Sequence, residues 1–428
     1  MATYVRHPRW ILVCRSCILL TMQPLFSGTP IGIYSSVFIT ASVLYVLFAL
    51  VMRRWTFPRT AVLVLIGVGI AVRAALLPIH PIGSDDIERY LWDGHVQSAG
   101  MDPYAYAPAD SALAHLHSAD LPARVNNPSF RTPYFPLTQW FFLLAWEAAG
   151  ENILGLKVLL FIAECLTLFV LARALRAYEL PRQYILLYAL CPLPVFMFAL
   201  DAHIDGLGLP LFLLGLVFWA GGRRTSSLIM FGLSLAIKPV ALVLLPGLFF
   251  AVRTWRERMM VIVVPLSIVV VQFIPYFWTS DPLAGIVAFG RNWYYNGAFF
   301  EAAFAFTKDN LSARLICGII LSASLLAVAW QRLSLPVTAY RSVLLLLLLS
   351  PVVHPWYFTW LAVLIPLTYA WSGISLLALA SLTSLTMLEY LISGIWGIDP
   401  WIMALEYVPV VVLMIIEMRQ NGPELVTK

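Results

Sequence analysis

The chain has 428 residues, of which 61% are hydrophobic and only 11% charged, and its mean hydropathy is +0.85. A soluble domain is about half apolar and roughly a quarter charged, so this composition excludes a soluble globular protein. The net charge of +5 comes mainly from basic residues in short loops between apolar runs. This is the positive-inside pattern of membrane proteins rather than a nucleic-acid-binding surface.

The apolar runs predict many membrane spans, because about 20 apolar residues cross the hydrocarbon core. The candidate spans lie at 9–26, 33–52, 60–78, 151–172, 183–200, 204–221, 226–252, 258–278, 311–330, 337–353, 356–371, 373–393 and 399–417. We therefore expect an all-α polytopic membrane protein with about 12–14 transmembrane helices. No polar segment is long enough for a second domain, so residues 1–428 are expected to form a single integral-membrane domain.

Two apolar runs are not expected to be simple spans. Residues 135–149 form a short run with Pro133 just before it and Pro136 at its start, which favours an interfacial or re-entrant helix. Residues 226–252 contain Lys238 followed by Pro239. Because proline breaks a helix, this run predicts a hairpin of two short helices with Lys238 at its tip. With both interpretations, the short basic loops all fall on one face, which should be cytoplasmic.

The same assignment gathers polar and aromatic clusters on the opposite face. They are the long loop 79–150 with its interfacial helices, D-A-H-I-D at 201–205, Lys238, the second loop 279–310, and H-P-W-Y-F-T-W at 354–360. We therefore expect an extracytoplasmic active site in the plasma (inner) membrane.

The stretch from Gly83 to Tyr106 carries the densest charge. Asp86, Tyr90, Asp93 and Gln97 share one face of a predicted helix. Asp85 and Glu88 have the spacing of a capping box, and Asp85 is four residues before Arg89, a spacing at which the two can pair. The acids either only cap this helix, or one of Asp85 and Asp86 is a general base; the sequence leaves the choice between the two open.

Later segments supply further candidates. Arg131, Tyr134 and Gln139 either line a groove or belong to a loop returning to the membrane. His203 and Asp205, with Asp201, suit sugar-hydroxyl or proton-relay contacts, a metal site, or a structural role; a divalent metal is possible but not favoured. Lys238, Arg291 and His354 are candidates for binding phosphate, whereas Tyr357 suits either substrate contact or an interfacial aromatic belt.

The order of these features resembles the GT-C superfamily of integral-membrane glycosyltransferases. It is most similar to the polyprenyl-phosphate-mannose-dependent mannosyltransferases. The resemblance is carried by S-D-D at 84–86, R-Y-x-W-D-G at 89–94, G-x-D-P-Y at 100–104, Y-F-P-L-T-Q at 134–139, Lys238-Pro239 and H-P-W-Y at 354–357. It implies Asp85 and Asp86 as catalytic residues, and it adds Arg89 and Tyr104 to the substrate-binding candidates.

The resemblance also implies the reaction. A sugar, most simply mannose, moves with inversion from a polyprenyl-phosphate donor to a lipid, glycan or protein acceptor. No W-W-D-x-G motif is present, which disfavours en bloc glycan transfer to asparagine. No cofactor is firmly implied, and the expected partners are the lipid-linked donor, the acceptor and the membrane.

Two other classes stay open. A transporter or lipid flippase would be expected to have internal repeats and polar residues within its spans, and the sequence has no evident repeat and few such residues. A structural subunit of a cell-envelope complex would tolerate mutation in the polar clusters.

Overall fold

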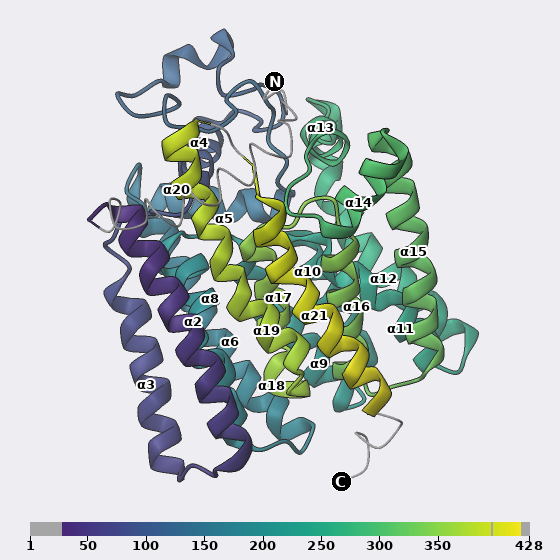
Figure 1. Cartoon of the computed structure of the whole chain (residues 1–428). Coiled ribbons are helices and arrows are strands. Elements are labelled where there is room, and N and C mark those ends of the chain that lie inside the picture. The colour runs from purple at the N-terminus through teal and green to yellow at the C-terminus, as the bar shows by residue number, and fades with distance from the viewer. Residues whose placement is uncertain (1–27, 395–396, 421–428) are drawn as a thin grey trace.

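The computed structural model describes residues 28–394 and 397–420. Within these ranges the protein is all-helical and forms no β-strand; an isolated parallel bridge joins Tyr295 to Val352. The predicted all-α architecture is therefore confirmed (Figure 1). The span expected at 9–26 lies outside the described residues.

The first half of the chain contains one long, mostly irregular segment between α4 and α5, which lies at one end of the bundle (Figure 1). Its helices are α2 (Pro30–Arg54), α3 (Arg59–Ala75), α4 (Asp86–Ser98), η1 (Ser111–Leu116), α5 (Pro136–Ala149), α6 (Leu154–Ala177), η2 (Arg182–Ile185), α7 (Leu186–Ala189), α8 (Pro192–Pro194), η3 (Val195–Leu200) and α9 (Asp205–Ala220).

The second half alternates long helices with short broken ones. Its helices are α10 (Arg224–Ile237), η4 (Pro239–Leu244), α11 (Leu245–Ala251), α12 (Trp255–Phe273), η5 (Ile274–Trp278), α13 (Ala284–Asn292), α14 (Ala298–Thr307), α15 (Asn310–Trp330), α16 (Leu335–Leu349), η6 (Pro355–Phe358), α17 (Thr359–Ala362), α18 (Ile365–Thr368), α19 (Trp371–Leu379), η7 (Ala380–Thr383), α20 (Ser384–Ser393) and α21 (Pro400–Gln420).

The protein is a multi-pass membrane protein. In the described chain, six helices are long and apolar enough to cross a membrane, or seven if the bent pair Arg182–Ala189 and Pro192–Leu200 is one span. Shorter apolar helices are Asp205–Ala220, Arg224–Ile237, Pro239–Ala251, Ala298–Thr307 and Leu335–Leu349. The expected 12–14 membrane helices thus correspond to full-length helices together with shorter ones that are cut by prolines or polar turns.

The run 226–252 reverses direction at Lys238, as predicted. The backbone of Lys238 is extended, with φ −152° and ψ 136°. The Arg224 guanidinium, at the start of α10, lies 3.8 Å from the ring centre of Trp219 near the end of α9. Lys238 contacts Asp205 at the start of α9, so α10 runs antiparallel to α9. The helix following Pro239 leads back toward the start of α12, where the Arg258 guanidinium lies 5.3 Å from the ring centre of Phe249.

The two ends of the bundle differ in composition. At one end, Gln183 donates a hydrogen bond to the Trp55 carbonyl, which joins two of the short basic loops. At the other end, Thr279 donates to Asp102 and so joins the second loop to the long loop. Figure 1 shows α4, α13 and the long loop at this second end, and the α2–α3 connection at the first. The basic loops and the polar clusters are therefore separated, as the sequence predicted.

A buried ion pair ties three apolar segments together. Arg73 Nε lies 2.7 Å from Glu164 Oε2, and both side chains are at most 2% exposed. Tyr188 donates its hydroxyl to the other oxygen of Glu164, and Arg73 also donates to the Ala189 carbonyl. In a low-dielectric interior such a pair is held only when its remaining hydrogen bonds are also satisfied.

Removing one charge of the Arg73–Glu164 pair should destabilise the protein more than removing both charges. We expect Glu164→Leu to destabilise the protein by about 3–5 kcal/mol, because it leaves the Arg73 charge buried without a partner. Arg73→Met combined with Glu164→Leu removes both charges and should restore much of the loss. Melting temperatures in detergent measure the difference; a double variant that melts below the single variant would contradict it.

Candidate active site

The acidic pair lies at the start of α4, at the polar end of the bundle. Asp85 is the N-cap residue, but its side chain makes no capping hydrogen bond. The Ser84 hydroxyl instead accepts from the Asp86 backbone N–H. The predicted capping box is therefore wrong, although both carboxylates still complement the positive end of the helix dipole.

The two carboxylates differ in environment. Asp85 is exposed, whereas the Asp86 side chain is 20% exposed. The amide of Asn126 donates to both, at 2.7 Å to Asp85 and 2.9 Å to Asp86. Tyr90, one helical turn after Asp86, directs its hydroxyl to the second Asp86 oxygen at 3.4 Å. Asp86 is therefore the carboxylate that faces the interior of the site.

A hydrogen-bonded clamp fixes α4 against α5. Arg89 pairs with Asp93 at 2.9 Å, so the predicted pairing of Arg89 with Asp85 is wrong. The Gln139 amide donates to the other oxygen of Asp93, and Gln97 donates to Gln139. Arg89 and Gln139 are buried, and their contacts with Asp93 set the position of α4 and thereby of Asp86.

Tyr104 and Tyr134 join the long loop to the same clamp. The Tyr104 hydroxyl donates to the Tyr134 carbonyl at 2.8 Å. The Tyr134 ring packs edge-on against Tyr90 with ring centres 5.2 Å apart. Tyr134 therefore supports Tyr90, the residue that contacts Asp86. Tyr104 in turn supports Tyr134 and so affects Asp86 only indirectly.

The turn D-A-H-I-D at 201–205 sends three polar side chains in three directions. Asp201 accepts hydrogen bonds from the Tyr34 hydroxyl and from the backbone N–H groups of Ile82 and Gly83. It thus fixes the chain just before the acidic pair. Each of these bonds is buried or partly buried, so a missing acceptor would leave buried donors unsatisfied.

The second side chain, His203, faces Asp86. Its Nδ1 lies 3.6 Å from Asp86 Oδ2, and the side chain is 1% exposed. Neither ring nitrogen forms a hydrogen bond within the described residues. The preceding residue, Ala202, has φ +60°, a conformation that non-glycine residues rarely adopt and that is often retained at functional sites. This backbone strain directs the imidazole toward the carboxylate.

The third side chain, Asp205, holds Lys238. Lys238 Nζ lies 2.7 Å from Asp205 Oδ2, and the Trp360 indole donates to Oδ1 at 2.8 Å. The ammonium group also lies 3.8 Å from the ring centre of Tyr357, a cation–π contact. Lys238 is therefore a fixed cation rather than a mobile surface lysine.

Four stacked rings extend from His203 toward the second loop. Successive ring centres are 3.7 Å apart for His203 and Trp356, 4.3 Å for Trp356 and His354, and 4.7 Å for His354 and Tyr295. The bridge between Tyr295 and Val352 brings the two loop segments together. The stack therefore links the second loop, through direct ring contacts, to His203, the residue beside Asp86.

Burial raises the pKa of the Asp86 carboxyl from its ordinary value to about 6. The Asn126 hydrogen bond lowers it, the Asp85 charge raises it, and the Lys238 charge lowers it. A carboxylate with a pKa in this range accepts protons more readily than a solvent-exposed one. The site thus combines a basic carboxylate with a fixed cation, which suits a proton transfer coupled to the stabilisation of negative charge.

The described residues contain no cluster of histidine, cysteine and acidic side chains suited to a metal ion. Asp201, His203 and Asp205 diverge to Tyr34, Asp86 and Lys238. The alternating spacing of these three residues is compatible with a metal site, but their side chains contact three different partners.

The structure brings together only part of the predicted set. Asp86, His203, Asp205, Lys238 and Tyr357 converge, and His354 joins them through the ring stack. Arg131 and Arg291 are exposed and make no ion pair within residues 28–394 and 397–420. They lie on segments that meet where the ring of Phe130 packs edge-on against Trp293 at 4.9 Å.

Sequence reasoning missed three contacts of the site. Asn126 is not among the predicted site residues, yet it bridges both acids. Trp356 and Trp360 lie in the predicted cluster at 354–360 without being predicted site residues, yet one stacks on His203 and the other donates to Asp205. The position of a tryptophan two or six residues after His354 does not indicate whether it contacts the site or lies at the membrane interface.

The family model for alpha-(1->6)-mannopyranosyltransferase, N-terminal domain, matches residues 16–254. Alpha-(1->6)-mannopyranosyltransferase A of Mycobacterium tuberculosis (strain ATCC 25618 / H37Rv) is 26% identical over 372 residues, covering 77% of this chain and 70% of that protein. The crystal structure of ArnT from Cupriavidus metallidurans bound to undecaprenyl phosphate is similar with a TM-score of 0.48 and 14% identity, covering 85% of this chain and 73% of ArnT. The family match includes the acidic pair, the D-A-H-I-D turn and Lys238.

The tight packing of Asp201 and Tyr34 around Gly83 allows a test of whether the 201–205 turn positions the chain before the acidic pair. A Cβ placed there would lie 2.4 Å from Asp201 Oδ2 and 2.5 Å from the Tyr34 hydroxyl. We expect Gly83→Ala to destabilise the protein by about 1–3 kcal/mol through overpacking, and to speed amide hydrogen exchange across residues 82–90.

Gly290→Ala is the matched control, because nothing lies within 4 Å of its added Cβ. Alanine favours a helix over glycine, so this variant should be neutral or slightly more stable. Equal melting temperatures and exchange rates for the two variants would contradict the proposed role of the turn.

Proposed function

Because the chain belongs to the alpha-(1->6)-mannopyranosyltransferase family, we propose that it transfers a mannosyl residue from a polyprenyl-phosphate donor to a hydroxyl group of a glycan or lipid acceptor, with inversion. The family match supports the glycosyltransferase class expected from the motifs. Asp86 acts as the general base in this proposal. The observation that carries it is the convergence of Asp86, His203 and Lys238 at one end of the bundle.

The proposed step balances as follows. The acceptor hydroxyl attacks the anomeric carbon, and Asp86 takes its proton. The bond from the anomeric carbon to the phosphate oxygen breaks, and the polyprenyl phosphate departs with its electrons. Phosphate is a good leaving group, so no general acid is needed; a cation that stabilises its developing charge is useful instead.

Burial of Asp86 supports its assignment over Asp85. A general base works best when its pKa lies near the working pH, and the pKa of the Asp86 carboxyl is about 6. Asp85 is exposed and shares the Asn126 amide with Asp86. Its proposed role is to position Asn126 and to maintain negative charge beside the base.

Lys238 is the proposed phosphate contact. Its pairing with Asp205 and its stacking on Tyr357 hold the ammonium group in place before substrate arrives. A preorganised cation stabilises leaving-group charge without reorganising during the reaction. Arg131 and Arg291, exposed on adjoining segments, are proposed to attract the anionic donor at the entrance.

A lipid-linked donor also fits the surroundings. The polar end of the bundle is opposite the basic loops, so by the positive-inside rule it is proposed to face the extracytoplasmic side of the plasma (inner) membrane. A donor anchored in the bilayer can reach such a site from the side. His354 and Trp356 would then hold the imidazole of His203 beside the base while the donor binds.

The base assignment predicts a change in rate. Asp86→Asn should reduce mannosyl transfer from polyprenyl-phosphate mannose by roughly 10²–10⁴-fold, the usual contribution of a general base. Asp85→Asn should cost much less. Because Asp86 must be deprotonated, wild-type kcat/KM should fall tenfold per pH unit below about 6.

The residual activity of Asp86→Asn should lack this acidic limb, whereas Asp85→Asn should retain it. An acidic limb that disappears in Asp85→Asn but persists in Asp86→Asn would assign the base to Asp85 instead.

The cation assignment needs a variant that leaves no buried charge unpaired. Lys238→Gln combined with Asp205→Asn removes both charges of the pair. We expect it to melt close to the wild type while its rate falls roughly 10²–10³-fold, the cost of losing one transition-state contact. Arg176→Gln, exposed on α6, is the control and should leave the rate unchanged. Wild-type rates in the double variant would rule out Lys238 as the phosphate contact.

A further inference from the structure

One buried acid in the last helix has no part in the proposed reaction. Glu406 lies on α21, a helix that is apolar and long enough to cross a membrane, and it is fully buried. No basic side chain of the described chain forms an ion pair with it. A charged carboxylate is strongly disfavoured in such surroundings unless it is paired. Glu406 therefore needs another way of being neutralised.

The polar partner of Glu406 is Asn296, in the second loop. The Asn296 amide nitrogen donates to Glu406 Oε2 at 2.9 Å, and Asn296 is also fully buried. The other two oxygens, Glu406 Oε1 and Asn296 Oδ1, have no hydrogen-bond partner in the described chain. One proton on Oε1 satisfies both, because a carboxylic acid and a primary amide can pair through two parallel hydrogen bonds. An ionised Glu406 would leave two acceptors buried without a donor.

This contact holds a strained turn of the second loop. Asn296 has φ +53°, a conformation that non-glycine residues rarely adopt. The Tyr407 hydroxyl donates to the Asn296 carbonyl at 2.8 Å, so α21 holds both the backbone and the side chain of this residue. A Cβ placed on Gly297 would lie 2.6 Å from the Ser350 carbonyl oxygen. The turn is thus packed between α21 and the segment that precedes His354.

Tyr295 connects this turn to the ring stack. The backbone N–H and carbonyl of Tyr295 both form hydrogen bonds with the segment 351–353, and its ring centre lies 4.7 Å from that of His354. From His354 the stack continues to His203 beside Asp86. A displacement of the turn would therefore reach His203 through direct contacts.

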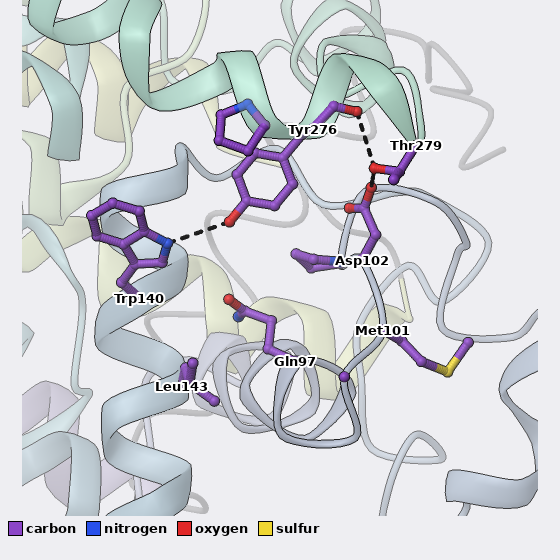
Figure 2. A pocket seen from close by; sticks show the side chains of 10 residues that line it. Gln97, Met101, Asp102, Trp140, Leu143, Tyr276 and Thr279 are labelled. Carbon is purple, nitrogen blue, oxygen red and sulfur yellow. Dashed lines mark hydrogen bonds between the residues drawn. The ribbon is translucent and has the colours of Figure 1, made fainter.

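The second loop has a separate attachment at its start. Figure 2 shows Thr279 beside Asp102 of the long loop, to which the Thr279 hydroxyl donates. The helix α13 lies between this contact and Asn296 in the chain. Loss of the Asn296 contact should therefore release the turn while the start of the loop stays attached.

We propose that Glu406 is protonated, forms a two-hydrogen-bond pair with Asn296, and through this pair positions the ring stack that holds His203 beside Asp86. Glu406 is thus a positioning residue that touches neither donor nor acceptor. Its effect on the reaction rests on the proposed function, whereas the pair itself does not. A neutral acid also explains how an apolar span carries Glu406 without a cation beside it.

Infrared difference spectroscopy tests the pair directly. Full-length wild type and Glu406→Gln in nanodiscs are compared at about pH 8, where an ordinary glutamate is ionised. The wild type should show the carbonyl stretch of a protonated carboxylic acid that Glu406→Gln lacks. Spectra that differ only in their carboxylate bands would show that Glu406 is ionised and would overturn the pair.

The positioning role is tested by comparing side chains at 406. Glu406→Gln keeps one donor and one acceptor at the same reach, so it should retain mannosyl transfer. Glu406→Ala removes both hydrogen bonds, and Glu406→Asp withdraws the acid by one methylene group. Both variants should lower kcat/KM by up to about 10²-fold, as expected when a catalytic group is slightly misplaced. Wild-type rates in Glu406→Ala, or an equal loss in Glu406→Gln, would overturn the role.

The pH profile separates positioning from a general loss of stability. A displaced His203 admits water to Asp86, and hydration lowers the pKa of a buried carboxyl. The acidic limb of kcat/KM in Glu406→Ala should therefore move below the wild-type value of about 6. Val410→Ala is the control, because Val410 is fully buried on α21 but packs in a different apolar cluster from Tyr295. An acidic limb that stays in place in Glu406→Ala would contradict the positioning role.

Amide hydrogen exchange separates this inference from the proposed function, because it requires no activity. Glu406→Ala should speed exchange across residues 293–297, 352–357 and 201–205, whereas Val410→Ala should not. If the wild type transfers no mannose, the proposed function is refuted, while exchange and infrared spectra still decide the pair and its link to the 201–205 turn. Equal exchange at 201–205 in Glu406→Ala and the wild type would overturn that link.

Discussion

The ion pair between Asp205 and Lys238 is the contact on which the rest of the site depends. It joins the start of α9 to the tip of a helical hairpin, and the same short turn directs His203 to Asp86 and fixes Gly83 through Asp201. The residues of the 201–205 turn thus help to position Asp86, its neighbour His203 and Lys238. In a protein that is mostly apolar, charges this close together persist only because each has a partner.

Helix breaks explain how such charges come to lie within a membrane protein. The chain interrupts its apolar helices at Asp201–Ile204 and at Lys238, and irregular backbone at membrane depth is tolerated only where it is buried in protein or lines a cavity. The buried Arg73–Glu164 pair is likewise tolerated because its hydrogen bonds are satisfied within the protein, and it joins helices rather than forming part of the site. The 201–205 turn differs from it in holding the His203 imidazole, neither of whose ring nitrogens has a hydrogen-bond partner in the described chain.

The sequence predicted the helical class, the reversal at Lys238 and the convergence of distant clusters, because apolar length, proline and loop charge act locally. It did not predict the partner of Arg89, since Asp85 and Asp93 are equally spaced from it and only the packing of α5 selects Asp93. It left Asp85 and Asp86 equivalent for the same reason: burial, which tertiary structure sets, distinguishes them. The ring stack from Tyr295 to His203 was also not predicted, because it joins three segments that lie about 60 to 150 residues apart. Its tyrosine and tryptophan also resemble interfacial aromatics.

We propose that Asp86 and Lys238 act on the same bound donor, Asp86 at the attacking hydroxyl and Lys238 at the departing phosphate. A cryo-electron microscopy structure of the protein with a polyprenyl phosphate and a hydroxyl-bearing acceptor tests this most directly. The account predicts a phosphate oxygen within hydrogen-bonding distance of Lys238 Nζ and an acceptor hydroxyl within hydrogen-bonding distance of an Asp86 oxygen. A phosphate bound among the basic loops at the other end of the bundle, with neither Asp86 nor Lys238 near it, would contradict it.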